Sequence, residues 1–252
     1  EMEMTNGTLN RVTIKTTKGE VLKGMVLGKK EKSGKQPAIL VIHGWTSQMA
    51  RYPERLAPAL EQGYVCVFFD MRGHGETGGD LSNYSREDHF NDCLAAYDFM
   101  IKLPMVDTEN ISVFGSSYGG YMASILSEKR TVHNLILKAP AQYPDEGWQE
   151  PKLSQVKDQV GGYRLEHHTT QDNMALKAIN LHVGRLLIIE CENDEQVPKQ
   201  VMDDYREFIS TEYDYELLEG SDHACKLPGM NDLFIERMGD WLIKLHEETY
   251  HD

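Results

Sequence analysis

The sequence lacks any apolar run that approaches the about 18 residues a membrane-spanning helix needs. It also lacks a basic stretch followed by an apolar one near its beginning, which favours a cytoplasmic location over secretion. Basic residues are outnumbered, with 26 Lys and Arg against 40 Asp and Glu and a formal net charge of −14. Such a charge repels phosphate backbones and anionic lipid headgroups, so we expect no nucleic-acid or membrane partner.

Cysteine and metal-ligand patterns are equally sparse. The four cysteines (Cys66, Cys93, Cys191 and Cys225) form no C-x-x-C pair. Two of them fall in or beside apolar strand-like runs, so we expect buried free thiols and no disulfides. The adjacent His167 and His168 would point in different directions on a helix or strand. Because no carboxylate or cysteine stands at a convincing ligand spacing, we expect neither a metal site nor a cofactor.

The sequence does contain a regular alternation of short apolar runs and helical stretches. Leu9–Thr16 and Val21–Leu27, joined by the turn-like Lys18-Gly19, predict an antiparallel hairpin. Fully apolar runs of four or five residues then follow, as expected for strands buried on both faces of a parallel sheet. These runs are Ala38–Ile42, Val65–Phe69, Ile111–Phe114, Leu135–Leu137 and Leu186–Ile189, with a weaker one at Tyr213–Leu218.

Helical stretches lie between these runs, at Tyr52–Gln62, Arg86–Leu103, Gly119–Glu128, Pro198–Ile209 and Asp232–His246. The pattern predicts a single α/β domain over residues 1–252, with a doubly wound, mostly parallel eight-stranded sheet and the hairpin at its N-terminal side. The segment Ala141–Gly184 interrupts the alternation because it is long, polar and weakly periodic. We expect a small helical cap there, since structureless loops of this length are uncommon.

A nucleophile motif follows the third apolar run of the parallel set. The strand-like Ile111–Phe114 leads into Gly115-Ser116-Ser117-Tyr118-Gly119 and then a helical segment. A Gly-x-Ser-x-Gly motif between a strand and a helix is typical of a nucleophile elbow, a tight turn that lifts the central serine above the sheet. Ser117 is therefore the candidate nucleophile, and Ser116 is a weaker rival because it does not occupy the centre.

A serine nucleophile needs a histidine base and an acid that orients it, in the chain order Ser, Asp or Glu, His. Downstream, the apolar run at Leu186–Ile189 ends in an acidic loop that holds Glu192, Asp194 and Glu195. His223 follows the strand-like Tyr213–Leu218 in a Gly-Ser-Asp-His-Ala loop. His223 is the candidate base, whereas we interpret most other histidines, His89 among them, as surface or packing residues.

From about Pro37 onward the chain resembles the α/β-hydrolases. Its Gly-Ser-Ser-Tyr-Gly-Gly-Tyr-Met segment is similar to that of prolyl-oligopeptidase-type and acylaminoacyl-peptidase-type hydrolases, while its compact size resembles feruloyl esterases and dienelactone-hydrolase relatives. The resemblance places Asp194 in the acid position of a Gly-x-x-Asp-x-x-Val-Pro pattern, although Cys191 replaces the glycine. Glu192 and Glu195 remain rival acids.

The resemblance also implies an oxyanion hole. Its donors would be the backbone N–H groups of Tyr118, which follows the nucleophile, and of Trp45 in the His43-Gly44-Trp45 loop. His43 is expected to brace that loop. The segment Asp70–Thr77 resembles the family's Asp-x-Arg-Gly-x-Gly loop, and we interpret it as structural, with Arg72 paired to carboxylates and His74 outside catalysis.

Aromatic and apolar residues of the predicted cap suggest a substrate pocket. Tyr143, Trp148, Tyr163 and Leu165 could line it, with Trp45 as a further wall. The expected activity is hydrolysis of small-molecule carboxylic esters with small to medium acyl groups. A peptidase or amidase of the acylaminoacyl or prolyl-oligopeptidase type, or a thioesterase, is the alternative, although no filtering propeller accompanies the hydrolase segment. A binding module without chemistry is disfavoured by the complete triad, and the hairpin could support a homodimer.

Overall fold

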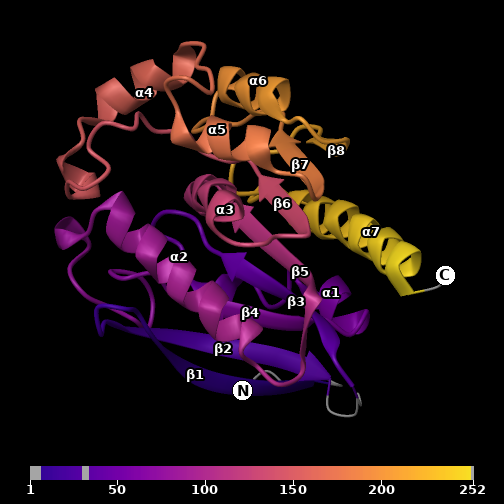
Figure 1. Cartoon of the computed structure of the whole chain (residues 1–252). Helices are drawn as coiled ribbons and strands as arrows, with labels where there is room; N and C mark the ends of the chain where they lie inside the picture. Colours follow the sequence, from indigo (N-terminus) through magenta and orange to yellow (C-terminus); the bar gives the residue numbers. More distant parts are fainter. Residues whose placement is uncertain (1–6, 30–33, 251–252) are drawn as a thin grey trace.

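The computed structural model describes residues 7–29 and 34–250, and its strands form one eight-stranded sheet in the order β1-β2-β4-β3-β5-β6-β7-β8 (Figure 1). Its strands are β1 (Gly7–Lys15), β2 (Val21–Lys29), β3 (Gln36–Ile42), β4 (Val65–Phe69), β5 (Val106–Ser116), β6 (Asn134–Lys138), β7 (Arg185–Cys191) and β8 (Tyr213–Leu218). β2 runs antiparallel to both β1 and β4, and every other neighbouring pair is parallel. The predicted fold is confirmed.

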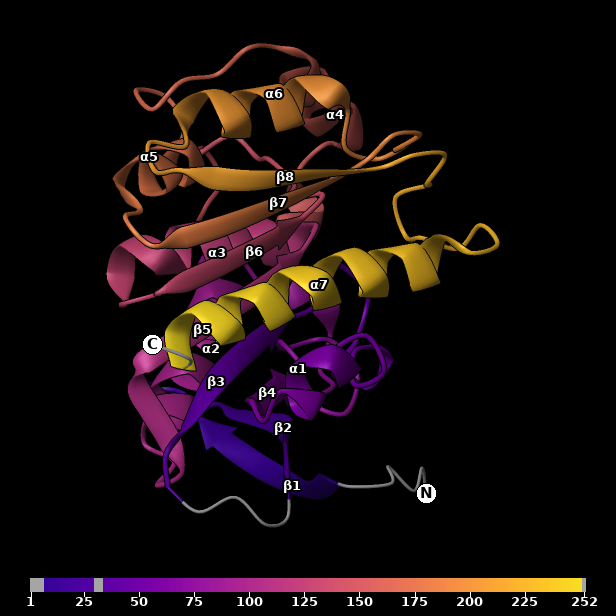
Figure 2. The same cartoon turned by 90° about the vertical axis from the view of Figure 1, so that its right-hand side faces the viewer.

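Helices cover both faces of this sheet. They are α1 (Ala57–Glu61), α2 (Arg86–Ile101), α3 (Tyr118–Lys129), α4 (Lys157–Leu165), α5 (Met174–Leu181), α6 (Lys199–Phe208) and α7 (Met230–Tyr250), with short 3-10 turns η1 (Met49–Arg51), η2 (Leu81–Asn83) and η3 (Lys152–Ser154). Side chains from α2, α3, α5 and α6 join one core cluster, and those from α1 and α7 join the other. Figure 2 shows α1 and α7 together on one side of the sheet.

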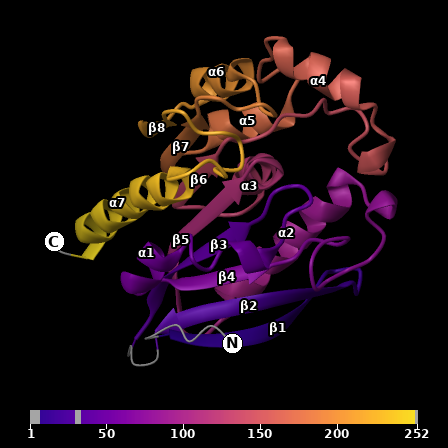
Figure 3. The ribbon, with the colours of Figure 1, turned by 180° about the vertical axis from the view of Figure 1, so that it is seen from behind.

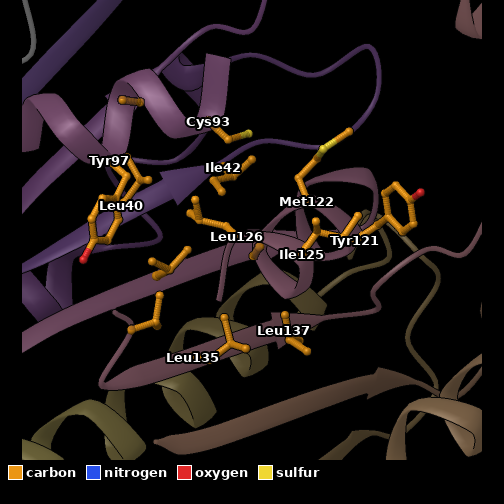
Figure 4. Packing of buried hydrophobic residues seen from close by; sticks show 14 of the residues in the cluster. Leu40, Ile42, Cys93, Tyr97, Tyr121, Met122, Ile125, Leu126, Leu135 and Leu137 are labelled. Atoms are coloured by element: carbon orange, nitrogen blue, oxygen red, sulfur yellow. The ribbon is translucent and has the colours of Figure 1, made fainter. Parts of the chain in front are cut away.

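Strand periodicity explains why two cores form. Along β4 every residue is buried, with Val67 on one face and its neighbours Cys66 and Phe68 on the other. Figure 4 shows the larger core, where Leu135 and Leu137 of β6 lie beside side chains of α3 such as Leu126. The central strands β3, β4 and β6 are thereby buried on both sides.

The segment between β6 and β7 combines a crossover helix with an insertion. α5 is a normal crossover helix: it packs against α3 and buries four apolar side chains (Ala175, Leu176, Ala178 and Ile179). The expected cap at 141–184 is therefore shorter than its sequence pattern indicated. Only the stretch that carries η3 and α4 stands away from the sheet, and no side chain of α4 is fully buried.

Backbone and side-chain hydrogen bonds fasten this insertion at two places. At its base, Asn173 Nδ2 donates to the Tyr143 carbonyl at 3.2 Å. At its far end, Lys152 N donates to the Tyr84 carbonyl at 2.9 Å and Glu87 N donates to the Trp148 carbonyl at 3.0 Å. Figures 1 and 3 show the insertion at the same end of the molecule as the beginning of α2. The insertion therefore bridges β6 and α2.

Within the described residues, none of the helices combines the length and the apolar composition needed to cross a membrane.

Candidate active site

Ser117 lies in a strained turn between β5 and α3. Its backbone angles, φ 55° and ψ −115°, fall in a region that side-chain-bearing residues rarely adopt. The turn is tight enough to need glycine on both sides. A Cβ atom at Gly115 would lie 2.2 Å from the Gly119 carbonyl oxygen, and one at Gly119 would lie 2.1 Å from the Ile42 carbonyl oxygen. These contacts are the physical basis of the Gly-x-Ser-x-Gly motif here.

Three side chains that are distant in sequence meet at this turn. The Ser117 hydroxyl oxygen lies 2.9 Å from His223 Nε2, and His223 Nδ1 lies 2.7 Å from Asp194 Oδ2. The Asp194 carboxylate also accepts the backbone N–H groups of Gln196 at 2.9 Å and Val197 at 2.7 Å. The carboxylate is thus fixed in place, so it holds His223 with Nδ1 protonated and Nε2 available to accept the serine proton.

The rival residues make other contacts. Glu195 accepts the backbone N–H of His223 at 3.1 Å, and Glu192 accepts that of Gly220 at 2.7 Å, so both hold the histidine loop without reaching the imidazole. Ser116 lies at the end of β5 and makes no hydrogen bond to His223 within the described part of the chain. Geometry therefore brings together Ser117, His223 and Asp194.

Two backbone N–H groups beside Ser117 are free to bind an oxyanion. In the loop after β3, the Gly44 N–H donates to Tyr52 Oη at 3.4 Å and the Thr46 N–H donates to His74 Nε2 at 3.1 Å. The Trp45 N–H between them has no acceptor among residues 7–29 and 34–250, nor has the Tyr118 N–H at the start of α3. Unpaired N–H groups at a helix start are suited to stabilising negative charge.

Buried histidines brace the two loops. His43 Nε2 accepts the Met71 N–H at 3.0 Å, so its Nδ1 donates to the Gly44 carbonyl at 2.7 Å, and this links the loops after β3 and β4. Burial lowers the pKa of His43 to about 3, which keeps the ring neutral. In the loop after β4, Arg72 pairs with Asp92 at 2.8 Å, as its interpretation as a structural residue requires.

A cavity of about 450 Å³ opens beside the triad. It is lined by Gly44, Trp45, Thr46, Ser47, Arg51, Tyr52, Arg55, Ser116, Ser117, Lys138, Gln196, His223, Ala224 and Lys226. A larger cavity, of about 770 Å³, is lined by Asn134, Arg185 and Tyr213 among others, at the opposite ends of β6, β7 and β8. Ligands of open α/β sheets bind at the carboxyl ends of the strands, so the smaller cavity is the candidate substrate site.

The expected pocket lining needs correction. Trp45 lines the cavity, but Tyr143, Trp148 and Tyr163 do not. The first two pack against α3 and α2, and the third packs within the insertion. Tyr143 packs on Tyr121 with ring centroids 5.0 Å apart, Trp148 packs on Phe90 at 5.8 Å, and Tyr163 stacks on His168 at 3.6 Å. Leu165 is largely exposed. The aromatic residues of the cap therefore pack against other rings and do not form the walls of this cavity.

Two residues beside the site carried no recognised signal in the sequence. Lys138 ends β6 fully buried, and its Nζ donates to the His223 carbonyl at 2.7 Å. His89, expected to be bland, is buried under Tyr118: its Nε2 donates to the Arg72 carbonyl and its Nδ1 accepts the Tyr118 hydroxyl, both at 2.8 Å. A lysine at the end of an otherwise apolar run was the only available hint.

The structure places the four cysteines and the adjacent His167 and His168 in different surroundings. All four cysteines are buried free thiols. His167, however, lies with Asp204 and Glu207 of α6 in a group whose ligand atoms are within 4.8 Å of one another. Asp204 is already engaged, since it accepts from His167, from the His168 N–H at 3.0 Å and from Gln200 at 2.8 Å. The group therefore anchors the insertion to α6.

A model of the prolyl oligopeptidase family matches residues 50–248. The chain belongs to the prolyl oligopeptidase family. It is 25% identical over 207 residues to a probable dipeptidyl-aminopeptidase B of Aspergillus oryzae, a match that covers 75% of this chain and 22% of the relative. The chain thus spans about a fifth of the length of such curated relatives.

Solved structures show the same fold. A putative dipeptidyl aminopeptidase IV from Bacteroides ovatus matches with a TM-score of 0.75 and 18% identity, over 96% of this chain and 36% of that one. The ferulic-acid-bound Est1E from Butyrivibrio proteoclasticus matches with a TM-score of 0.68 and 18% identity, over 92% of this chain and 98% of that one. This prolyl oligopeptidase family member is accordingly a serine hydrolase with the α/β-hydrolase fold.

Proposed function

We propose that this chain hydrolyses carboxylic esters of small to medium acyl groups, with Ser117 as nucleophile, His223 as base and Asp194 as orienting acid. One observation carries the proposal: an unbroken hydrogen-bonded chain runs from the hydroxyl of the strained Ser117 through both nitrogens of His223 to a fixed carboxylate. Such an arrangement activates a serine that is otherwise a weak nucleophile. It needs no cofactor.

The proposed reaction has two halves. As Ser117 Oγ attacks the ester carbonyl, His223 Nε2 takes the hydroxyl proton, and the N–H groups of Trp45 and Tyr118 stabilise the oxyanion. His223 then gives the proton to the departing alcohol, leaving an acyl group on Ser117. Water, deprotonated by His223, attacks the acyl-enzyme and releases the acid. Asp194 stabilises the imidazolium in both halves.

The charge of the cavity supports esters over peptides with a free amino terminus. Four basic side chains (Arg51, Arg55, Lys138 and Lys226) line the cavity, and no carboxylate does among the described residues. An α-ammonium group is repelled by such a lining, whereas a neutral or anionic ester is accepted. The chain's overall charge of −14 makes this local excess of basic residues more distinctive.

The second candidate is hydrolysis of peptides or amides. Membership of the prolyl oligopeptidase family and similarity to a probable dipeptidyl-aminopeptidase B support it. An acylated amino terminus, as an acylaminoacyl peptidase requires, would avoid the repulsion described above. Thioesters are also accessible to the same nucleophile. These candidates differ in the leaving group and share the triad.

The test is hydrolysis of p-nitrophenyl esters of increasing chain length, beside an aminoacyl p-nitroanilide, an N-acetylated aminoacyl p-nitroanilide and a hydroxycinnamate ester. Ester turnover that falls at least about a thousandfold in Ser117→Ala is expected, with Ser116→Ala as the matched control that retains activity. A kcat/KM for an anilide above that for the esters would replace the proposal with the peptidase candidate. Turnover that survives in Ser117→Ala would refute the assigned nucleophile.

A further inference from the structure

A lysine of the insertion reaches the residues that flank the nucleophile. Lys152, in η3, places its Nζ 3.7 Å from the ring centroid of Trp45, 5.2 Å from that of Tyr118 and 4.9 Å from that of Tyr143. Three ring faces thus surround one ammonium group. Within the described part of the chain, this ammonium has neither a hydrogen-bond acceptor nor a carboxylate partner.

Two guanidinium groups lie against the same Tyr143 ring, Arg86 at 5.4 Å and Arg164 at 4.9 Å from its centroid. Arg86 is fully buried and donates to Tyr121 Oη and the Glu146 carbonyl. Arg164 donates to the carbonyls of Gln142 and Gln196. All these acceptors are neutral, and no ion pair between described residues includes Lys152, Arg86 or Arg164.

This basic cluster combines Arg86, which is fully buried, with Lys152 and Arg164, which are partly exposed, and such a concentration of positive charge is costly without a counter-charge. Buried charges are normally paired, because desolvation penalises an isolated one far more than a neutral hydrogen bond repays. Among the described carboxylates, Asp145 is near enough to Arg86 for the guanidinium to oppose the rise that burial causes in the pKa of Asp145, but no carboxylate pairs with Lys152 or Arg164. The absent partner is therefore expected to be an anion that the protein binds.

Unpartnered polar atoms beside the cluster also indicate a bound anion. The Gln142 side chain is 1% exposed, and neither its Nε2 nor its Oε1 has a hydrogen-bond partner. Arg86 Nε is also buried without an acceptor. Buried polar groups without a partner are uncommon in folded proteins and suggest that a ligand supplies the missing hydrogen bonds. Gln142 lies next to the cluster, because its carbonyl accepts from Arg164 at 2.9 Å.

The position of the cluster relative to the triad identifies the part of the substrate it would meet. The leaving group must face His223, which protonates it, and the neighbouring Ala224 and Lys226 also line the cavity. Lys152 instead contacts the rings of Trp45 and Tyr118, the two residues proposed to form the oxyanion hole. Lys152 does not itself line the 450 Å³ cavity, but it contacts the ring of Trp45, which does, and the proposal places its ammonium on the side of the retained acyl group.

We propose that the basic cluster is a carboxylate subsite and that Lys152 makes the chain selective for esters whose acyl group ends in a carboxylate, such as half-esters of dicarboxylic acids. This inference rests on the proposed esterase function. The substrate carboxylate would replace the missing counter-charge, with Lys152 as its principal donor. Charge-assisted hydrogen bonds of this kind are shorter and stronger than neutral ones.

The protonation of Lys152 gives the subsite a pH dependence. Burial, reinforced by Arg164 and Arg86, lowers the pKa of Lys152 to about 7. The other titratable groups facing it are neutral near this pH: burial raises the pKa of Tyr118 and Tyr143 and lowers that of His74. The ammonium is half formed at pH 7, predominates at lower pH and is lost as pH rises, so selectivity for anionic acyl groups falls as pH rises through 7.

The experiment compares mono-p-nitrophenyl adipate with p-nitrophenyl hexanoate, which differ by a carboxylate in place of a methyl group. The measured quantity is the ratio of their kcat/KM values. We expect Lys152→Met to lower this ratio about tenfold to hundredfold, and Lys152→Arg to retain most of it but without the pH dependence. The matched control is Lys157→Met, an exposed lysine of the same insertion, which leaves the ratio unchanged.

The pH profile of the ratio separates the subsite from the triad, because the titration of His223 affects both esters equally and cancels. Binding of free adipate by calorimetry, tighter in wild type than in Lys152→Met, tests the subsite without any turnover. If no ester is cleaved yet adipate binding depends on Lys152, the esterase proposal fails and the carboxylate site stands. A ratio and an adipate affinity that are both unchanged in a folded Lys152→Met variant would overturn the inference.

Discussion

At the residue scale, the acid loop shows how a carboxylate is selected from three candidates. Asp194 reaches the His223 imidazole because two backbone N–H groups hold its other oxygen in the loop. Glu192 and Glu195 have longer side chains and are used to hold the backbone of the facing loop. The shorter Asp194 side chain is thus held rigidly against the imidazole, and the longer Glu192 and Glu195 side chains stabilise the loop that carries His223.

This division of roles predicts the effect of isosteric substitutions. Asp194→Asn is expected to lower kcat about ten-thousandfold, because the amide no longer favours the imidazole tautomer with Nε2 free to accept a proton. Glu195→Gln and Glu192→Gln, the matched controls, should change kcat less than about tenfold. Steady-state kinetics on the best ester would measure all three. Equal losses in Asp194→Asn and Glu195→Gln would show that the acid has been assigned wrongly.

At the scale of elements, two glycine environments contrast sharply. Gly119 lies in α3, where an added Cβ would meet the Ile42 carbonyl oxygen at 2.1 Å. Gly161 lies in α4, where an added Cβ would meet nothing within 4 Å. Glycine is required at the first position by close packing of α3 on β3. At the second it only lowers the stability of the helix.

We therefore expect opposite outcomes from the same substitution. Gly161→Ala should stabilise α4 by about 0.5–1 kcal/mol, because alanine has the higher helix propensity and no clash results. Gly119→Ala should destabilise the protein by about 1–3 kcal/mol or more, because the backbone of β3 or α3 must move. Amide hydrogen exchange within α4 measures the first effect, and urea unfolding measures the second. Faster exchange in Gly161→Ala would contradict the expectation.

Elements with a single strong period could be predicted from the sequence. Val65–Phe69 and Tyr213–Leu218 were predicted with the observed bounds. The first is apolar throughout because it is buried on both faces, whereas the second alternates in polarity and is buried only at Leu218. α5 was assigned to the cap because it is short and lies in a polar surrounding. Its eight residues are helical mainly through packing on α3, a tertiary contribution that local periodicity does not contain.

The candidate triad could likewise be predicted, since each member follows a recognisable strand, whereas the basic cluster could not. Lys152 contacts Trp45 and Tyr143 only because the folded insertion brings them together. Its partners are uncharged rings, so no charge pattern in the sequence predicts the contact. The role of Lys138 also depends on a distant partner, the carbonyl of His223. Contacts between a loop and a remote loop have no periodicity, so residue patterns do not contain them.

At the scale of the whole molecule, charge is distributed unevenly. The net charge is −14, yet the cavity beside Ser117 and the cluster around Tyr143 are basic. Repulsion between the many surface carboxylates opposes the compact state, and this repulsion acts over the Debye length. The edge strand β1 has one unpaired side, and a homodimer formed through it stays a prediction.

The net charge predicts a salt-dependent stability. Raising NaCl from about 10 to 150 mM shortens the Debye length from about 30 to 8 Å, so the urea midpoint at pH 7.5 should rise. Near the isoelectric point of about 5.1 the same change should have little effect. Urea unfolding at both pH values measures this, with KCl as a control for specific ion effects. A midpoint that falls with salt at pH 7.5 would show that attractive pairs dominate.

The hydrogen bond between Asn173 and the Tyr143 carbonyl closes the base of the insertion, so the chain leaves and re-enters the hydrolase body at one place. An insertion whose two ends lie close together can change in length or sequence with little effect on the rest of the fold. Lengthening it costs little closure entropy, which grows only logarithmically with loop size, and its residues can be exchanged without shifting the strand register. Substitutions in the insertion are therefore expected to change the proposed acyl subsite while the triad and its sheet stay in place.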